Sequence, residues 1–109
     1  MDMGIKRFEI YWCAFDPTRG SEIKKTRPCI VVSPDEMNPY LETVIVAPIT
    51  STVKHRPFRV ECKIKNKNSS ILLDQIRSID KSRLGAKIGV TTPKTSHEIV
   101  TILQEIFSM

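Results

Sequence analysis

TRGSEIKKTRPCIVVS, residues 18–33, joins a polar segment to an apolar one and decides how the rest of the chain is interpreted. Residues 18–26 are polar and contain a glycine, so we expect a loop there. Cys29–Val32 is a continuous apolar run rich in β-branched residues, which predicts a buried strand. Arg27 lies at the junction, where Pro28 favours an extended backbone for the residue before it. A charge held by a strand beside a loop is typical of a functional site, although a solvated arginine at an ordinary junction has the same pattern.

The composition indicates one small domain. The chain has 109 residues, of which 40% are apolar, and this is enough for a single core over residues 1–109. It has no apolar run of about 18 residues and no apolar signal-peptide core, so we expect a cytoplasmic protein without a membrane span. The three cysteines, at positions 13, 29 and 62, are too widely spaced for a metal site, so we expect buried free thiols and no cofactor.

The positive charge is concentrated in one stretch. The net charge is +5, which allows a nucleic-acid partner without requiring one. Residues 54–67 hold six basic side chains against one acidic side chain, a difference equal to the excess of the whole chain. The basic residues are Lys54, Arg56, Arg59, Lys63, Lys65 and Lys67.

Short alternating segments predict a mainly β protein. In the first expected strand, Phe8, Ile10 and Trp12 occupy one face. The expected strands are Phe8–Phe15, Cys29–Val32, Thr43–Ala47, Phe58–Lys65, Ser69–Leu73 continuing as a bent strand to Asp80, and Ala86–Val90.

Two helical segments are expected besides these strands. Ser33 followed by Pro34 predicts one short helical turn. Apolar residues at helical spacing predict a C-terminal helix, which begins either at Thr92-Pro93 or at the capping box that Thr95 opens. The order of elements favours a small curled antiparallel sheet or half-open barrel closed by this helix.

Polar residues at the expected strand ends suit a phosphodiester substrate. Arginine binds phosphate through a planar fork of donors, and the hydroxyls of Thr50 and Ser51 add further donors. Gln75 can read a base edge, and Lys54, Arg56 and Lys63 can follow a backbone. RNA carries its own nucleophile, the 2′-OH, so an enzyme need only align it, move protons and stabilise charge on phosphorus. His55 and His97 are isolated in the sequence, and a surface position is the simpler interpretation of His97.

Five sequence blocks in this order resemble the MazF/PemK toxins of bacterial toxin–antitoxin pairs. They are FEIYW (8–12), DPTRGSE (16–22), TRPCIVVS (26–33), VAPITS (46–51) and LDQIRSID (73–80). The resemblance implies the family's small SH3-like antiparallel barrel with a C-terminal helix, assembled as a homodimer. It implies metal-independent cleavage of single-stranded RNA at a short sequence, leaving a 2′,3′-cyclic phosphate and a 5′-OH. It also implies a partner, a small acidic MazE-like antitoxin that folds on contact.

The resemblance also implies roles for individual residues. Arg27 and Thr50 match the family's catalytic arginine and hydroxyl residue, and Glu22 matches an acid implicated in activity. Because the pKa of arginine exceeds about 12, we assign Arg27 first to charge stabilisation, and the choice of general base between Glu22 and Arg27 stays open. The residues expected to bind RNA are Ser51, Lys54, Arg56, Asp74, Gln75 and Arg77.

Structural roles remain open for the same residues. Glu22 would equally form a salt bridge with Lys25 or Arg27, Asp74 a strand-end hydrogen bond, and Thr50 a loop cap. Two other functions compete with the ribonuclease. A CcdB-like toxin that binds gyrase has the same barrel but a Trp-Gly-Ile tail, whereas this chain ends in Phe-Ser-Met. A non-catalytic nucleic-acid-binding barrel would keep the basic stretch but would not need Arg27 and Thr50 together.

Overall fold

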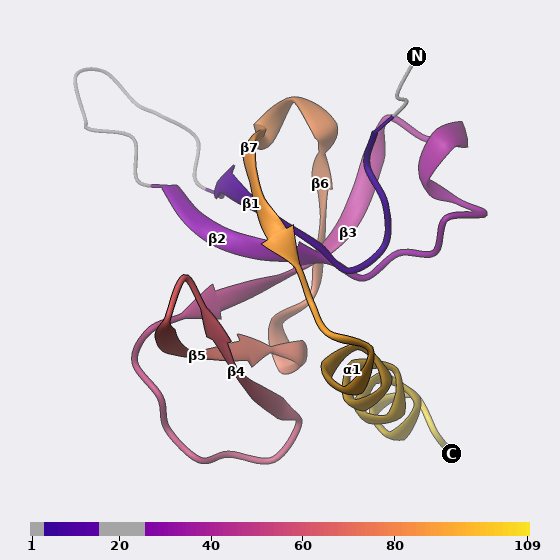
Figure 1. Ribbon diagram of the computed structural model, residues 1–109. Helices are drawn as coiled ribbons and strands as arrows, with labels where there is room; N and C mark the ends of the chain where they lie inside the picture. Colours follow the sequence, from indigo (N-terminus) through magenta and orange to yellow (C-terminus); the bar gives the residue numbers. More distant parts are fainter. Residues whose placement is uncertain (1–3, 16–25) are drawn as a thin grey trace.

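A strongly bent antiparallel sheet with one helix packed beside it makes up the fold (Figure 1). The computed structural model describes residues 4–15 and 26–109. The strands are β1 (Glu9–Ala14), β2 (Thr26–Val31), β3 (Thr43–Thr50), β4 (Arg59–Ile64), β5 (Lys67–Leu72), β6 (Arg77–Asp80) and β7 (Leu84–Val90). The helical elements are α1 (Pro93–Ile106) and the 3₁₀ turns η1 (Asn38–Tyr40), η2 (Leu73–Gln75) and η3 (Lys81–Arg83).

β3 connects the two halves of the sheet. The strand order is β4-β5-β3-β2-β1-β7, and β6 pairs with β3 outside this path. The first residues of β3 pair with β6, from Thr43 opposite Asp80, whereas its last residues pair with β5 through Ile49 opposite Ile71. This change of partner along one strand bends the sheet into a half-barrel and confirms the expected curled antiparallel architecture.

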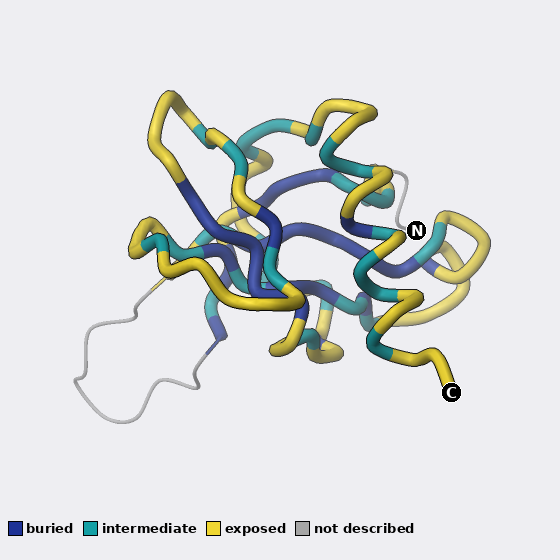
Figure 2. Tube along the Cα trace, turned by 90° about the horizontal axis from the view of Figure 1, so that it is seen from below, coloured by how far each residue is buried: buried dark blue, intermediate teal, exposed yellow. Residues whose placement is uncertain are grey.

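The core lies on both faces of the central strands. One cluster of buried side chains includes Ile30 and Ile71, and α1 contributes Ile99 to it. A second cluster, on the other face of β1 and β2, contains Tyr11 and Cys13. Figure 2 shows this arrangement, with buried positions along the central strands and exposed positions at the turns and on the outer side of the helix. The described thiols are free, as expected, although Cys62 is only half-buried.

A buried carboxylate ties the N-terminal segment to the far edge of the sheet. The sequence placed Glu9 opposite the apolar face of its strand, yet its side chain is only 9% exposed. It accepts hydrogen bonds from the Lys6 N–H and the Tyr11 hydroxyl, both at 2.7 Å, and lies 2.6 Å from the Lys87 ammonium on β7. Burial acts to raise the pKa of Glu9, but these bonds outweigh burial and hold the pKa below its usual value.

Several expected element boundaries are wrong, and β3, for example, runs to Thr50 instead of ending at Ala47. β2 begins at Thr26 and not at Cys29, so Arg27 and Pro28 lie within the strand. Residues 73–75 form η2 and interrupt the expected bent strand. The short helical turn is η1 rather than a helix capped by Ser33, because the Ser33 hydroxyl donates to Asn38 Oδ1 at 2.6 Å and accepts from the Ile45 N–H at 3.0 Å. That hydroxyl therefore serves tertiary contacts.

The start of α1 resolves an ambiguity in the sequence. Thr92 is the N-cap, since its hydroxyl oxygen accepts a hydrogen bond from the Thr95 N–H at 3.2 Å, and Pro93 follows it. The helix packs against β4 and η2 through Ile99, which is fully buried. Within residues 4–15 and 26–109, no helix combines the length and the hydropathy needed to cross a bilayer.

Candidate RNA-binding cleft

An open cleft of about 550 Å³, the main cleft, lies where β2, β3 and the β4–β5 hairpin meet. Its volume falls within the range of about 300–1,000 Å³ that is usual for small-molecule sites. The lining residues are Trp12, Arg27, Pro28, Ile49, Thr50, Ser51, Thr52, Ile64, Lys65, Lys67, Ser69 and Ile88.

Strand register brings Arg27 and Thr50 together. β2 and β3 are antiparallel, with Cys29 opposite Pro48 and Ile30 opposite Ala47. Arg27 and Thr50 lie two residues beyond the Cys29–Pro48 pair on their strands, and both residues line the main cleft. Arg27 is exposed, and its guanidinium forms no hydrogen bond or ion pair with residues 4–15 or 26–109. Its donors are therefore not engaged by the described part of the chain.

A row of hydroxyl side chains follows Arg27 around the cleft. Thr50, Ser51 and Thr52 are consecutive at the end of β3. The Thr50 Oγ1 accepts a hydrogen bond from the Thr52 N–H at 3.1 Å. Because the oxygen is the acceptor in this bond, the hydroxyl proton of Thr50 is able to donate to a ligand. Together with Arg27, this row can bind the non-bridging oxygens of a phosphate.

The β4–β5 hairpin adds two lysines to the opposite wall. Its turn residues, Lys65 and Asn66, have positive φ angles of 52° and 65°, as a tight hairpin turn requires. This turn brings the Lys65 ammonium to 6.0 Å from the centroid of the Trp12 ring, and Lys67 lines the same wall. None of the described lining residues is acidic, so the main cleft is electropositive and suits an anionic polymer.

Three of the expected RNA-binding residues lie on another part of the surface. Asp74, Gln75 and Arg77, on η2 and β6, are exposed but do not line the main cleft. Asp74 pairs with Arg59 through two bonds, Nε to Oδ1 at 3.1 Å and Nη2 to Oδ2 at 3.2 Å. The bonds from Arg59 hold the pKa of Asp74 below its usual value. The Arg77 guanidinium lies 5.5 Å from the centroid of the Phe15 ring, and the role of all three in RNA binding stays a prediction.

The basic loop before β4 borders a smaller pocket of about 420 Å³. His55, which is isolated in the sequence, is paired through Nδ1 with a carboxylate oxygen of Glu61 at 2.6 Å in the structure. Lys63 also lines this pocket, whereas Lys54 and Arg56 are exposed on the loop. His97 is exposed on α1, as expected.

Glu22 belongs to residues 16–25, which lie outside the described part of the chain. Its assignment as a catalytic acid or base therefore stays a prediction. The strands on either side of that segment are described: β1 ends at Ala14, and β2 begins at Thr26, one residue before Arg27 in the main cleft.

Trp12 is the cleft residue that the sequence reasoning missed. Alternation grouped it with Phe8 and Ile10 on the apolar face of the first strand. Ile10 is buried in the core, but Trp12 is 37% exposed and lines the main cleft. Alternation with a period of two residues predicts which side chains share one face of a strand. It does not predict how far along that face the core extends. The presence of the chain's one tryptophan near a strand end was the available signal.

Known proteins share this fold and sequence pattern. Residues 6–107 match the model of a family described as PemK-like, MazF-like toxin of type II toxin–antitoxin systems. The chain is 34% identical over 101 residues to the endoribonuclease MazF of Staphylococcus saprophyticus, which covers 87% of this chain and 84% of that protein. The crystal structure of MazF from Deinococcus radiodurans in form I has a TM-score of 0.80 at 26% identity, covering 99% of this chain and 100% of that one.

One further solved structure is an endoribonuclease from a mycobacterial species in complex with its cognate antitoxin. It has a TM-score of 0.81 at 23% identity and covers 97% of each chain, a likeness that shows the fold alone. The half-barrel with one C-terminal helix is therefore shared across these structures.

Proposed function

Because the chain belongs to the PemK-like, MazF-like toxins of type II toxin–antitoxin systems, an endoribonuclease family, we propose that it cleaves single-stranded RNA at a short sequence without a metal ion. The observation that carries this proposal is the meeting of Arg27 and Thr50 in one electropositive cleft. Messenger RNA in the cytoplasm of a bacterium is the proposed target, and its cleavage inhibits translation and growth.

The proposed reaction uses the nucleophile that RNA carries. The 2′-OH loses its proton and attacks the adjacent phosphorus while the bond from phosphorus to O5′ breaks and O5′ takes up a proton. The products are a 2′,3′-cyclic phosphate and a 5′-OH, so no water is consumed. Negative charge increases on the non-bridging oxygens in the transition state, and donors that are already in place stabilise this charge without reorganising.

Arg27 and Thr50 are the proposed donors. The guanidinium binds two phosphate oxygens through its planar fork, and its positive charge stabilises the phosphorane. The Thr50 hydroxyl, whose oxygen already accepts from the Thr52 N–H, donates its proton to the same phosphate or to the leaving oxygen. Ser51, which also lines the cleft, is proposed to contact the adjacent nucleotide.

Proton removal from the 2′-OH is assigned to Glu22 or to Arg27. A carboxylate accepts a proton readily near neutral pH, whereas arginine with a pKa above about 12 does not. Substitution of Glu22 by glutamine distinguishes the two. Loss of the acidic limb of the pH–rate profile would identify Glu22 as the base, and an unchanged profile would leave that role to Arg27.

RNA outside the main cleft is proposed to follow the basic surface. Lys54 and Arg56 are exposed on the loop before β4, and Asp74, Gln75 and Arg77 on η2 and β6 would contact further nucleotides. A homodimer and a small acidic MazE-like antitoxin are the proposed partners of this chain. The mycobacterial relative that was solved with its cognate antitoxin supports the second of these.

Cleavage of a long single-stranded RNA in EDTA, with both product ends mapped, tests the proposal. We expect discrete cuts at a recurring motif, each with a cyclic-phosphate end and a 5′-OH end. Intact RNA from a folded sample would overturn the proposal, and inhibition of gyrase would then be assayed. Cleavage that requires a divalent cation would overturn the metal-independent mechanism.

A further inference from the structure

Trp12 occupies an unusual place for the chain's one tryptophan. In the central strand β1 it is the exposed residue, 37% exposed, between Tyr11 at 8% and Cys13 at 1%. Tryptophan contributes most to stability when its large ring is buried, so a partly exposed ring in a central strand leaves stabilising apolar area unused. A ring that is held by a rigid strand and open on one side is suited to bind a flat partner.

The surroundings of Trp12 are apolar on the side of the sheet. Pro28 lies directly opposite Trp12 on β2, and Ile49, Ile64 and Ile88 line the same cleft. The next position along β2 is Arg27, which lines the polar end of the cleft with Thr50. A nucleotide whose phosphate is bound by Arg27 would therefore have an apolar surface within the same cleft for a base.

Among the residues that the structure describes, Lys65 places its ammonium group over the Trp12 ring. Its ammonium lies 6.0 Å from the ring centroid, at the outer limit of a cation–π contact. Such a contact is weak and an incoming group can replace it. Side chains that combine an aromatic face with a nearby cation are characteristic of grooves that bind single-stranded nucleic acids, where bases stack and phosphates pair.

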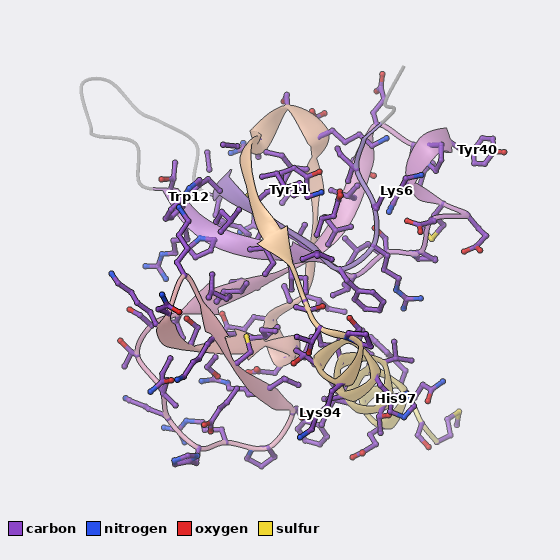
Figure 3. The ribbon with its side chains drawn as sticks, in the orientation of Figure 1. Lys6, Tyr11, Trp12, Tyr40, Lys94 and His97 are labelled. Carbon is purple, nitrogen blue, oxygen red and sulfur yellow. The ribbon has the colours of Figure 1, made fainter. Side chains whose placement is uncertain are left out.

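We propose that Trp12 forms a stacking subsite for one nucleobase next to the scissile phosphate, and that Lys65 moves from the ring to a phosphate of the same strand. The proposal rests on the proposed ribonuclease function and names a substrate contact within it. Figure 3 shows Trp12 on the side of the molecule that carries the β4–β5 hairpin, away from Tyr40 on η1 and from Lys94 on α1. These two residues supply matched controls.

An abasic scan of the substrate tests the subsite. RNA substrates that lack one base at a time near the cut are compared on the wild type and on Trp12→Leu. We expect base removal at one position to lower kcat/KM of the wild type by about 5- to 150-fold, mainly through KM, because stacking binds substrate and transition state alike. On Trp12→Leu the same removal should change kcat/KM less than about twofold, whereas Tyr40→Leu, which alters an exposed aromatic outside the cleft, should keep the wild-type profile.

Fluorescence of the wild type provides a second readout that needs neither cleavage nor a folded variant. All tryptophan emission comes from Trp12. An oligonucleotide with 2′-deoxyribose at the scissile nucleotide, which cannot be cut by 2′-OH attack, should change this emission on binding. The same oligonucleotide without the stacked base should change it much less. Lys65→Gln should weaken binding and its salt dependence, and Lys94→Gln should not.

Two outcomes would overturn the stacking subsite. One is an abasic profile of Trp12→Leu that parallels the wild-type profile. The other is an equal change in Trp12 emission with the intact and abasic oligonucleotides. If Trp12→Leu does not fold, Trp12→Phe, which keeps an aromatic ring, replaces it and should show a reduced dependence on the base. Absence of any RNA cleavage by the wild type contradicts the proposed function instead, and the fluorescence titration distinguishes that failure from failure of the subsite.

Discussion

Substitution of Arg27 by alanine should abolish most RNA cleavage while leaving the fold intact. Arg27 is the only guanidinium among the described residues that line the main cleft. Removal of one positioned donor to a developing oxyanion typically costs about 2.7–4 kcal/mol, or about 10²–10³ in kcat. Arg27 is exposed and forms no hydrogen bond or ion pair with a described residue, so the free energy of unfolding should change by less than about 0.5 kcal/mol. Arg27→Lys keeps the positive charge but loses the planar fork of guanidinium donors, so its kcat should fall between that of the wild type and that of Arg27→Ala.

Thr50→Val tests whether the hydroxyl acts at the same phosphate. Valine has nearly the shape of threonine but lacks the donor. The Thr52 N–H loses its acceptor at 3.1 Å, and because Thr52 is exposed, water can replace that bond at little cost to stability. We expect a loss of about 10² in kcat if the hydroxyl stabilises the transition state.

The double variant Arg27→Ala/Thr50→Val tests whether the two residues act on the same phosphate. Arg27 and Thr50 line the same cleft, so both should act on one phosphate and their effects should not add. We expect a coupling energy of about 0.5–3 kcal/mol in the activation free energies. The assay is single-turnover cleavage of one defined RNA in EDTA, with urea unfolding of each variant and Lys94→Ala on the outer side of the molecule as the control. Strict additivity, or wild-type kcat for Arg27→Ala, would refute the shared site.

Three further outcomes are expected. Glu9→Gln should lower the free energy of unfolding by about 1–3 kcal/mol at pH 7, because it weakens the bonds from Lys87 and Tyr11. The pKa of Glu9 is lowered on folding from its ordinary value of 4.5, so its stabilisation is complete above that value and is lost as pH falls through the folded pKa. The difference in urea unfolding between the two proteins should therefore shrink as pH falls below 4.5, and a constant difference would contradict this account. Ile99→Ala should lower the free energy of unfolding in urea by about 2–5 kcal/mol, because Ile99 of α1 is fully buried. Thr101→Ala, at an exposed position on the same helix, should change that free energy little. Similar values for both variants would show that α1 does not contribute to the core as described. Lys67→Gln should reduce the slope of log K against log salt for a non-cleavable oligonucleotide by about 0.7, and a slope unchanged from that of the wild type would exclude a phosphate contact at Lys67.

Local patterns were sufficient for most of the elements. Strict alternation from Phe58 to Lys65 predicted β4, because a half-exposed strand needs one apolar and one polar face. Helical spacing of Ile99, Ile102 and Ile106 predicted α1. Boundaries that were wrong, such as those at Thr26, Thr50 and η2, depend on pairing with segments that are distant in sequence, which no local pattern contains.

The sequence also predicted only part of the candidate site. The chemical character of Arg27 and Thr50 was readable from residue type and from the five family blocks. The adjacent residues Thr50 and Ser51 also indicated neighbouring hydroxyl donors. The position of Trp12 in the cleft was not readable, because a tryptophan in an alternating strand has the same pattern whether the core or a cleft lies beneath it.

By itself, the sequence determined which segments become strands and helix, where positive charge accumulates, and which family the chain resembles, since each depends on composition, periodicity or motif order along the chain. Only the tertiary structure decided that Arg27 and Thr50 line one cleft, that Lys65 lies over the Trp12 ring and that Asp74 pairs with Arg59 outside the main cleft. The physical reason is that these contacts follow from strand register and from the bend of β3 between two sheet halves. Register is set by burial across the whole sheet, so residues far apart in sequence meet only after the core has formed.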